Sequence, residues 1–258
     1  MELFTKEDGG YKYIETDPGN EKTLLLLHGL FGALSNFKSI IDQFRGKLNV
    51  VVPLLPIFEL PLRKLSVTGL VNHVNQFVRY KNFKSVNLVG NSLGGHVAVL
   101  FALDRPDILR SMTLTGSSGL FEAALGSTFP KRGNYEFVQK KTESTFYDPA
   151  VASRELVDEV YDIVNDRNKA IRVIAIAKSA IRHNIGDRLH EITRPVLLVW
   201  GIQDTITPAF VGEKFKELLP DARLYLLDKC GHAPMMEHPE EFNRFLNNFL
   251  VEVGEIKS

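Results

Sequence analysis

Cysteine is almost absent from this 258-residue chain, and charge of neither sign is in excess. The single cysteine, Cys230, excludes an internal disulfide framework. The 31 Lys and Arg residues balance 31 Asp and Glu residues, whereas a protein that binds nucleic acid needs a basic surplus. We therefore expect no disulfides and no nucleic acid as a main partner.

Long apolar runs and targeting signals are also missing. No run reaches the roughly 18 residues of a membrane span, and the sequence does not begin with a basic stretch followed by an apolar one. No metal-ligand spacing, phosphate-binding loop or dinucleotide fingerprint is present. These absences predict a soluble, cytoplasmic protein with no membrane contact, no metal and no cofactor, and they leave its oligomeric state unknown.

Short apolar runs bounded by Gly and Pro recur along the chain, and they are typical of strands buried on both faces of a parallel sheet. They span residues 23–27, 49–55, 85–89, 110–115, 195–200 and 222–227, and residues 11–16 fit a strand of an opening hairpin. Helical spacing of apolar residues occurs over residues 67–80, 93–103, 208–219 and 240–251. This alternation predicts an α/β fold with a mostly parallel central sheet flanked by helices.

Residues 117–190 interrupt the alternation. Asp148-Pro149 resembles a helix start, and two helical stripes of apolar residues follow, over residues 156–164 and 171–181. We interpret residues 117–190 as a helical cap insertion, and residues 1–116 and 191–258 as the core. Such a helical layer over the carboxyl ends of the strands would cover a site there.

A nucleophile elbow of the form G-x-S-x-G lies at Gly90-Asn91-Ser92-Leu93-Gly94. It follows a predicted strand and precedes a predicted helix, which is the context that the motif requires. The serine of such a turn has a strained backbone, and small flanking residues let the neighbouring backbone approach. The sequence therefore makes Ser92 the candidate nucleophile.

A serine hydroxyl needs a base to activate it, and the base needs an orienting carboxylate. His232 follows the last predicted strand, in a loop from which it can reach Ser92. Cys230, two residues earlier, is interpreted as a small packed residue rather than a redox-sensitive one. The other histidines are weaker candidates. His73, His96 and His238 look like structural or surface residues, and His183 and His190 belong to the insertion or its exit.

Asp204 is the candidate for the orienting carboxylate, because it follows the strand predicted over residues 195–200. Its alternative role is a turn or helix cap, but Thr207 is better placed to cap the next helix. Asp187 and Asp228 are weaker candidates.

An oxyanion needs two preorganised N–H donors. The backbone amide of Leu93, directly after the nucleophile, is one candidate, and that of Leu30, in the loop after the first central strand, is the other. His28, which opens this loop, is expected to brace it, with a catalytic role as the alternative.

Four motifs together resemble the α/β-hydrolase superfamily over nearly the whole chain: His28-Gly29, the Gly-Asn-Ser92-Leu-Gly-Gly elbow, Trp-Gly-Ile-Gln-Asp204 and Cys-Gly-His232-Ala-Pro. The resemblance implies a Ser-Asp-His triad and a helical cap. The chain departs from it after the second central strand, where many members have Asp-x-x-Gly-x-Gly. This chain has the stretch from Pro53 to Pro61 there, in a loop that lines the site mouth in the family.

The expected activity is that of a serine hydrolase acting on a small to medium carboxylic ester. Phe31 and Asn91 are the candidate substrate-binding residues. Asn91 also resembles the residue before the serine in meta-cleavage-product hydrolases, which cut carbon–carbon bonds in ring-fission dienoates, although Ala233 stands where those enzymes often carry Trp. Such a carbon–carbon hydrolase, and a hydrolase-fold ligand receptor with slow turnover, are the alternatives.

Overall fold

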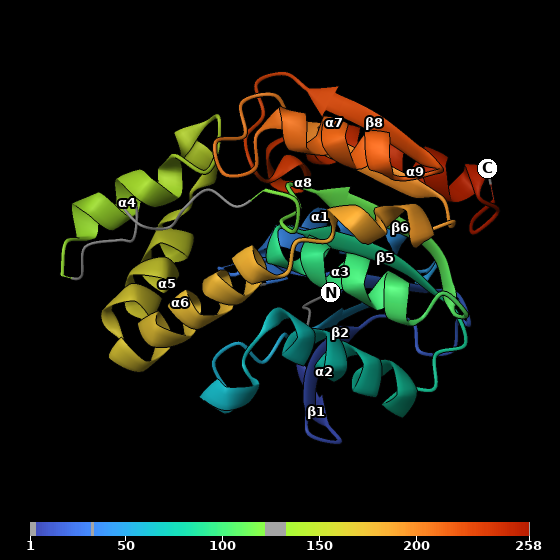
Figure 1. Cartoon of the computed structure of the whole chain (residues 1–258), viewed down its shortest axis with the longest axis horizontal. Coiled ribbons are helices and arrows are strands. Elements are labelled where there is room, and N and C mark those ends of the chain that lie inside the picture. Colours follow the sequence, from blue (N-terminus) through green and yellow to red (C-terminus); the bar gives the residue numbers. More distant parts are fainter. Residues whose placement is uncertain (1–3, 32–33, 122–132, 258) are drawn as a thin grey trace.

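The computed structural model describes residues 4–31, 34–121 and 133–257, and these form a mixed, eight-stranded sheet between two layers of helices (Figure 1). The strands lie in the order β1-β2-β4-β3-β5-β6-β7-β8. Their bounds are β1 (Lys6–Asp8), β2 (Tyr11–Glu15), β3 (Thr23–Leu27), β4 (Asn49–Pro53), β5 (Val86–Asn91), β6 (Leu109–Thr115), β7 (Val196–Gly201) and β8 (Ala222–Leu227). Only the pairs β1–β2 and β2–β4 are antiparallel among these strands. The predicted α/β class is confirmed.

The central strands β3, β4 and β5 are buried along their whole length. Helices cover both faces of the sheet, which explains why these strands are continuous apolar runs rather than alternating ones. The register places Gly90 between Leu27 and Leu114, and it pairs Thr115 with Val199. The carboxyl ends of β3, β5, β6 and β7 therefore meet at one edge of the sheet, where open parallel sheets bind their ligands.

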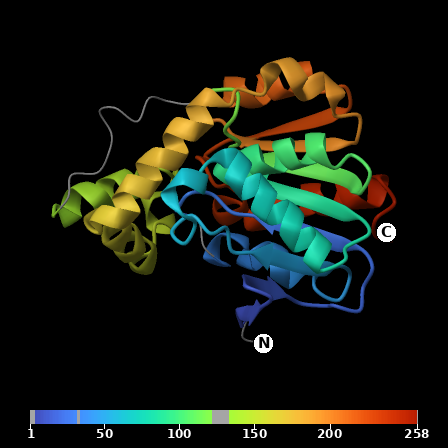
Figure 2. The ribbon, with the colours of Figure 1, turned by 60° about the horizontal axis from the view of Figure 1, so that its bottom comes forward.

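Helices α2, α3 and α7 cover one face of the sheet, and α1 and α9 cover the other. Figure 2 shows α2 and α3 side by side across the first face. Two apolar clusters result, one around Phe77 and Phe101 and the other around Phe44 and Phe242. The bounds are α1 (Lys38–Phe44), α2 (Val67–Tyr80), α3 (Leu93–Asp104), α7 (Ala209–Leu218), α8 (Pro234–Glu237) and α9 (Pro239–Glu252).

Three helices lie beyond the edge of the sheet, at the left of Figure 1: α4 (Tyr135–Glu143), α5 (Arg154–Asn165) and α6 (Arg167–Arg182). We call them the inserted helices, because they follow β6 and precede β7. The cap and the first helical Pro expected at Asp148-Pro149 are present, but they start a 3₁₀ turn over Pro149–Val151. The helix α5 starts separately, where the Ser153 hydroxyl accepts the Leu156 N–H.

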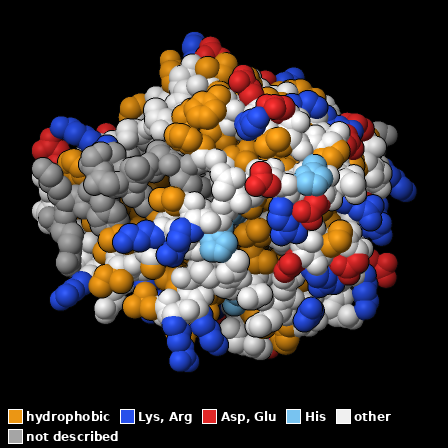
Figure 3. Space-filling model, in the orientation of Figure 1, with side chains coloured by type: hydrophobic (Ala, Val, Ile, Leu, Met, Phe, Trp, Pro, Cys, Tyr) orange, Lys and Arg blue, Asp and Glu red, His pale blue; other side chains and the backbone are white. Residues whose placement is uncertain are grey.

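The surface carries both signs of charge. On the face shown in Figure 3, Lys and Arg side chains are interspersed with Asp and Glu side chains over the sheet layers, as the equal counts of the two kinds predict. Within the described residues, no helix combines the length and apolar character that a membrane crossing needs.

Candidate active site

Ser92 occupies the turn between β5 and α3 with φ 55° and ψ −121°. A positive φ is unfavourable for a residue with a Cβ, and such strain costs about 1–3 kcal/mol. Two glycines make the turn possible. A Cβ on Gly90 would lie 2.6 Å from the Gly95 Cα, and a Cβ on Gly94 would collide with the Leu27 carbonyl oxygen. The predicted elbow is therefore present, with Ser92 fixed by backbone geometry.

Asp204 and His232 form a buried pair, and the two residues are 4% and 7% exposed. The Nδ1 of His232 lies 2.9 Å from Asp204 Oδ2, which fixes the proton on Nδ1 and leaves Nε2 as the acceptor. Burial by itself would raise the pKa of Asp204. The charge that the His232 ring carries when it is protonated, its hydrogen bond, and the Thr207 and Ile206 amides lower that pKa below its usual value. Asp204 therefore stays ionised and holds the imidazole ring.

Thr207 completes the carboxylate's surroundings. Its N–H donates to Asp204 Oδ1 at 2.9 Å, and its hydroxyl donates to Oδ2 at 2.9 Å. The expectation that Thr207 caps the next helix is wrong, because Pro208 occupies the cap position of α7 and no side chain bonds there. The Thr207 carbonyl oxygen instead accepts the Trp200 indole N–H at 2.7 Å. The loop that carries Asp204 and Thr207 is thereby anchored to the core.

The elbow and the His232 loop meet at the end of β6. The Ser92 N–H donates to the Thr115 carbonyl oxygen at 3.1 Å. At the next residue, a Cβ on Gly116 would lie 2.8 Å from His232 Nδ1. The structure thus brings Ser92, Asp204 and His232 to the same edge of the sheet.

Asn91 lies beneath this meeting point and is 3% exposed. Its amide nitrogen donates to the carbonyl oxygens of Thr115, at 3.1 Å, and His232, at 3.3 Å. Both amide protons are used internally. The geometry therefore favours a brace between the elbow and the base loop over the substrate contact expected of Asn91.

Of the two amides expected to hold an oxyanion, that of Leu93 belongs to the elbow itself, and that of Leu30 follows Gly29, where a Cβ would lie 3.2 Å from the Ser92 Cβ. Leu93 is the first residue of α3, where an N–H has no partner within its helix. His28 braces the Leu30 loop, since its Nε2 accepts the Leu55 N–H at 2.9 Å and its Nδ1 donates to the Gly29 carbonyl oxygen at 2.8 Å. Burial lowers the pKa of His28, so the ring is neutral. These bonds agree with the expected brace.

Phe31 links the same loop to the inserted helices. It packs half-buried against a small apolar cluster formed by Val138 of α4 and by Val160 and Val164 of α5. A side chain in this position lies between the core and the inserted helices, where an apolar part of a substrate could enter.

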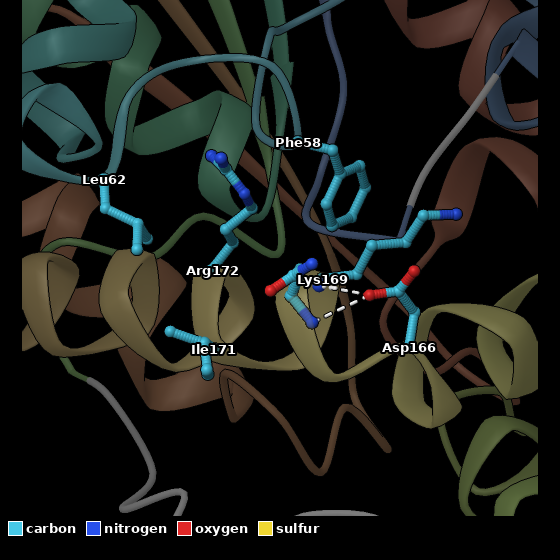
Figure 4. Close-up of a pocket in the computed structure, with 7 residues that line it drawn as sticks. Phe58, Leu62, Asp166, Lys169, Ile171 and Arg172 are labelled. Atoms are coloured by element: carbon cyan, nitrogen blue, oxygen red, sulfur yellow. Dashed lines mark hydrogen bonds between the residues drawn. The ribbon is translucent and has the colours of Figure 1, made fainter.

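A pocket of about 330 Å³ opens between α6 and the loop that follows β4. Figure 4 shows Arg172 pointing from α6 toward the loop that carries Phe58 and Leu62. A guanidinium nitrogen of Arg172 donates to the Leu60 carbonyl oxygen, and the Lys169 ammonium lies 5.8 Å from the centre of the Phe58 ring. This is the loop in which the chain departs from the family pattern. Its pocket is lined by apolar side chains and by charged ones of both signs, Lys169 and Arg172 beside Asp166.

The remaining candidates lie in structural positions. Cys230 is fully buried, and burial, followed by the charge of Glu237, raises the pKa of its thiol, so it is the inert packed residue expected. His238 contacts the Lys229 carbonyl oxygen at 2.9 Å. His73 packs against the Tyr11 ring, 5.1 Å between centres. Within the described part of the chain, no group of three or more His, Cys, Asp or Glu side chains could hold a metal ion.

Two residues of this site were not identified from the sequence. One is Thr207 as a partner of Asp204, for which the three-residue spacing was the available signal. The other is Glu237, whose carboxylate binds the backbone on both sides of His232. Its position five residues after the base was the only local signal.

The family model for the α/β hydrolase fold matches residues 22–239. The chain belongs to the α/β-hydrolase family. This confirms the resemblance drawn from the four motifs. Among solved α/β hydrolases, the enzyme MGS-MChE2 from the sediment metagenome of the lagoon of Mar Chica, Morocco, is 42% identical, with a TM-score of 0.79. The match covers 96% of this chain and 98% of that one.

Curated α/β-hydrolase relatives act on two kinds of bond. A 2-hydroxy-6-oxononadienedioate/2-hydroxy-6-oxononatrienedioate hydrolase of Pseudomonas sp is 27% identical, over 91% of this chain and 90% of the relative. Monoacylglycerol lipase abhd6-A of Xenopus laevis is 24% identical, over 97% of this chain and 82% of the relative. Relatives of both kinds mean that family membership alone does not choose between an ester and a carbon–carbon bond.

Proposed function

We propose that this α/β hydrolase is a serine carboxylesterase with Ser92 as nucleophile, His232 as base and Asp204 as orienting acid. The observation that carries the proposal is the juxtaposition at the end of β6. There the strained Ser92 backbone binds the Thr115 carbonyl oxygen, and the ring of the Asp204-bound His232 lies against Gly116, the next residue.

The reaction follows from the roles that the geometry supports. Ser92 Oγ attacks the acyl carbonyl carbon while His232 Nε2 takes its proton, and Asp204 stabilises the imidazolium that forms. The amides of Leu30 and Leu93 donate to the oxyanion, each contributing about 3–4 kcal/mol to the transition state. The tetrahedral intermediate collapses as His232 returns the proton to the leaving alcohol. Water then cleaves the acyl-enzyme by the same route.

The proposed substrate is a small to medium ester with an apolar acyl part. Phe31 and the apolar cluster of α4 and α5 support this, since they place an apolar surface beside the oxyanion loop. In this proposal residues 117–190 form a cap over the site and residues 1–116 and 191–258 form the core. A cytoplasmic location stays a prediction.

Carbon–carbon hydrolysis is the second candidate, and the relative from Pseudomonas sp favours it. Against it, the Asn91 amide is already bound to two backbone carbonyls, and Ala233 follows the base. A ligand receptor built on this fold would share the same triad and would differ in its turnover.

A substrate panel tests the proposal. The purified protein is assayed with p-nitrophenyl esters of increasing acyl length and with a ring-fission dienoate, beside Ser92→Ala. We expect ester turnover, highest for short to medium acyl chains, that Ser92→Ala abolishes. Turnover of the dienoate alone would favour the carbon–carbon hydrolase. Turnover of every compound below about one event per minute, together with a ligand-dependent rise in Tm, would favour the receptor.

A further inference from the structure

One carboxylate holds the backbone on both sides of the proposed base. Glu237, the last residue of α8, accepts the Gly231 N–H at 2.9 Å and the Ala233 N–H at 3.4 Å, both on Oε1. These amides belong to the residues directly before and after His232. Hydrogen bonds from N–H groups to an ionised carboxylate are about twice as strong as neutral ones. Glu237 therefore limits how far the His232 backbone can move.

The second carboxylate oxygen of Glu237 binds the segment between α4 and α5. Glu237 Oε2 accepts the Tyr147 N–H at 2.7 Å, across 90 residues of sequence. A residue that served only to cap its own short helix would bind the Ala233 amide. Of the three backbone N–H bonds to Glu237, the longest goes to Ala233, and the shorter two go to the loop that carries His232 and to the segment after α4. The Cys230 thiol lies against the same carboxylate, with Sγ 3.9 Å from Oε1.

The segment over residues 144–147, which follows α4, also contacts the triad loops directly. The His232 N–H donates to the Thr145 carbonyl oxygen at 2.9 Å, and the Thr205 hydroxyl donates to the Ser144 carbonyl oxygen at 3.2 Å. The packing is close enough to require a glycine, since a Cβ on Gly231 would lie 2.6 Å from the Thr145 carbonyl oxygen. Figure 1 shows the chain at the end of α4 beside the loops that lead into α7 and α8.

We propose that Glu237 is a positioning residue for His232, and that through it the segment over residues 144–147 sets the geometry of the base. The inference rests on the proposed function, because it needs His232 to be the base. The proposal adds a residue outside the triad. It also gives the segment over residues 144–147, which belongs to the proposed cap, a role besides covering the site. Without the carboxylate, two N–H groups beside His232 and the Tyr147 N–H lose their common acceptor, and the base loop can separate from this segment.

The test compares Glu237→Gln with Glu240→Gln, an exposed glutamate three residues later. The amide of Gln keeps one acceptor oxygen but places an NH2 group opposite an N–H donor. We expect kcat for a short p-nitrophenyl ester to fall on the order of 10-fold to 100-fold, the effect of a small misplacement of a catalytic group. KM should change little, because the substrate surface is untouched. Glu237→Asp, which keeps the charge, should recover part of the loss, and Glu240→Gln should behave as wild type.

Activity per active site separates positioning from a merely structural role. In Glu237→Gln, kcat per active site should fall while KM stays close to the wild-type value. A folded Glu237→Gln protein with wild-type kcat would overturn the inference. So would a loss that disappears when kcat is expressed per active site, counted by burst titration, because that loss reports folding alone.

His232→Gln tells the two failures apart. If His232→Gln keeps full turnover, the proposed function itself is wrong. If His232→Gln is inactive and Glu237→Gln is normal, the triad assignment survives and only the role of Glu237 is lost.

Discussion

The proposed nucleophile and the proposed base of this hydrolase are held in different ways. Ser92 is fixed by steric constraint within the core, where β5 turns into α3 and no Cβ can be added at Gly90 or Gly94. His232 is fixed by polar contacts, through Asp204 on one side and Thr145 on the other. One half of the site therefore depends on backbone packing, and the other half depends on hydrogen bonds that join separate parts of the chain.

The difference predicts two kinds of failure. A substitution at the tightly packed glycines of the nucleophile side should destabilise the fold, because the contacts that pack the core there also set the geometry of the elbow. A change on the base side should leave the fold and remove activity, because hydrogen bonds between loops contribute only about 0.5–3 kcal/mol each to stability. Substitutions made on each side separately test this difference.

Asp204→Asn should have the largest effect on activity. The amide cannot hold the imidazole with its proton on Nδ1 and stabilise the imidazolium, so we expect kcat to fall by a factor on the order of 10⁴. Circular dichroism should show a retained fold. Asp228→Asn is the matched control, since the Asp228 carboxylate is exposed and bonds to Gln203. Equal activity in the two variants would remove Asp204 from the proposed triad.

Gly94→Ala should have the largest effect on the fold. Its new Cβ would collide with the carbonyl oxygens of Leu27 and His28, so we expect a loss of about 3 kcal/mol or more in unfolding free energy. Chemical denaturation measures this loss. Gly19→Ala meets no atom within 4 Å and should leave the midpoint almost unchanged. A Gly94→Ala protein as stable as wild type would show that the elbow is not sterically fixed.

Thr207→Val should have an intermediate effect on the base side. It removes the hydroxyl that donates to Asp204 Oδ2 but keeps the volume and the backbone amide. We expect kcat to fall by about 10-fold, the equivalent of one hydrogen bond to a charged group. Thr207→Ser keeps the hydroxyl and should recover most of the activity. If Val and Ser variants are equally impaired, the packing of the methyl group matters and the hydrogen bond does not.

The pH dependence of stability should show the smallest effect. The Asp204 pKa is lowered in the folded protein, so its contribution is complete above the unfolded value near 4 and is lost as the pH falls through the folded value. The unfolding free energies of wild type and Asp204→Asn should therefore converge as the pH falls from about 5 to about 3. A constant difference over this range would mean that Asp204 has an ordinary pKa in the fold.

The parts that local pattern determines could be predicted from sequence. The strands over Thr23–Leu27 and Ala222–Leu227 and the helix over Val67–Tyr80 were predicted with their observed bounds, because continuous apolar runs or a clear helical stripe end there at turn residues. Helix α1 (Lys38–Phe44) was not predicted. It has seven residues and no side-chain cap at its start, so neither periodicity nor capping marks it.

The contacts around the site were less predictable. The elbow around Ser92 could be predicted because it is a local motif. Asn91 was expected to contact substrate, yet its amide binds Thr115 and His232, which are 24 and 141 residues away. The bond between Glu237 and Tyr147 likewise joins segments 90 residues apart. Such contacts depend on how distant segments of the chain pack together, and the local spacing of residues does not predict them.

Active-site labelling tests the central claim most directly. The protein is treated with a fluorophosphonate, and the adduct is mapped by peptide mass spectrometry in wild type, Ser92→Ala and His232→Gln. The proposed triad predicts a single adduct on Ser92, none in Ser92→Ala, and labelling slowed by orders of magnitude in His232→Gln. An adduct on another residue, or labelling of His232→Gln at the wild-type rate, would contradict the account.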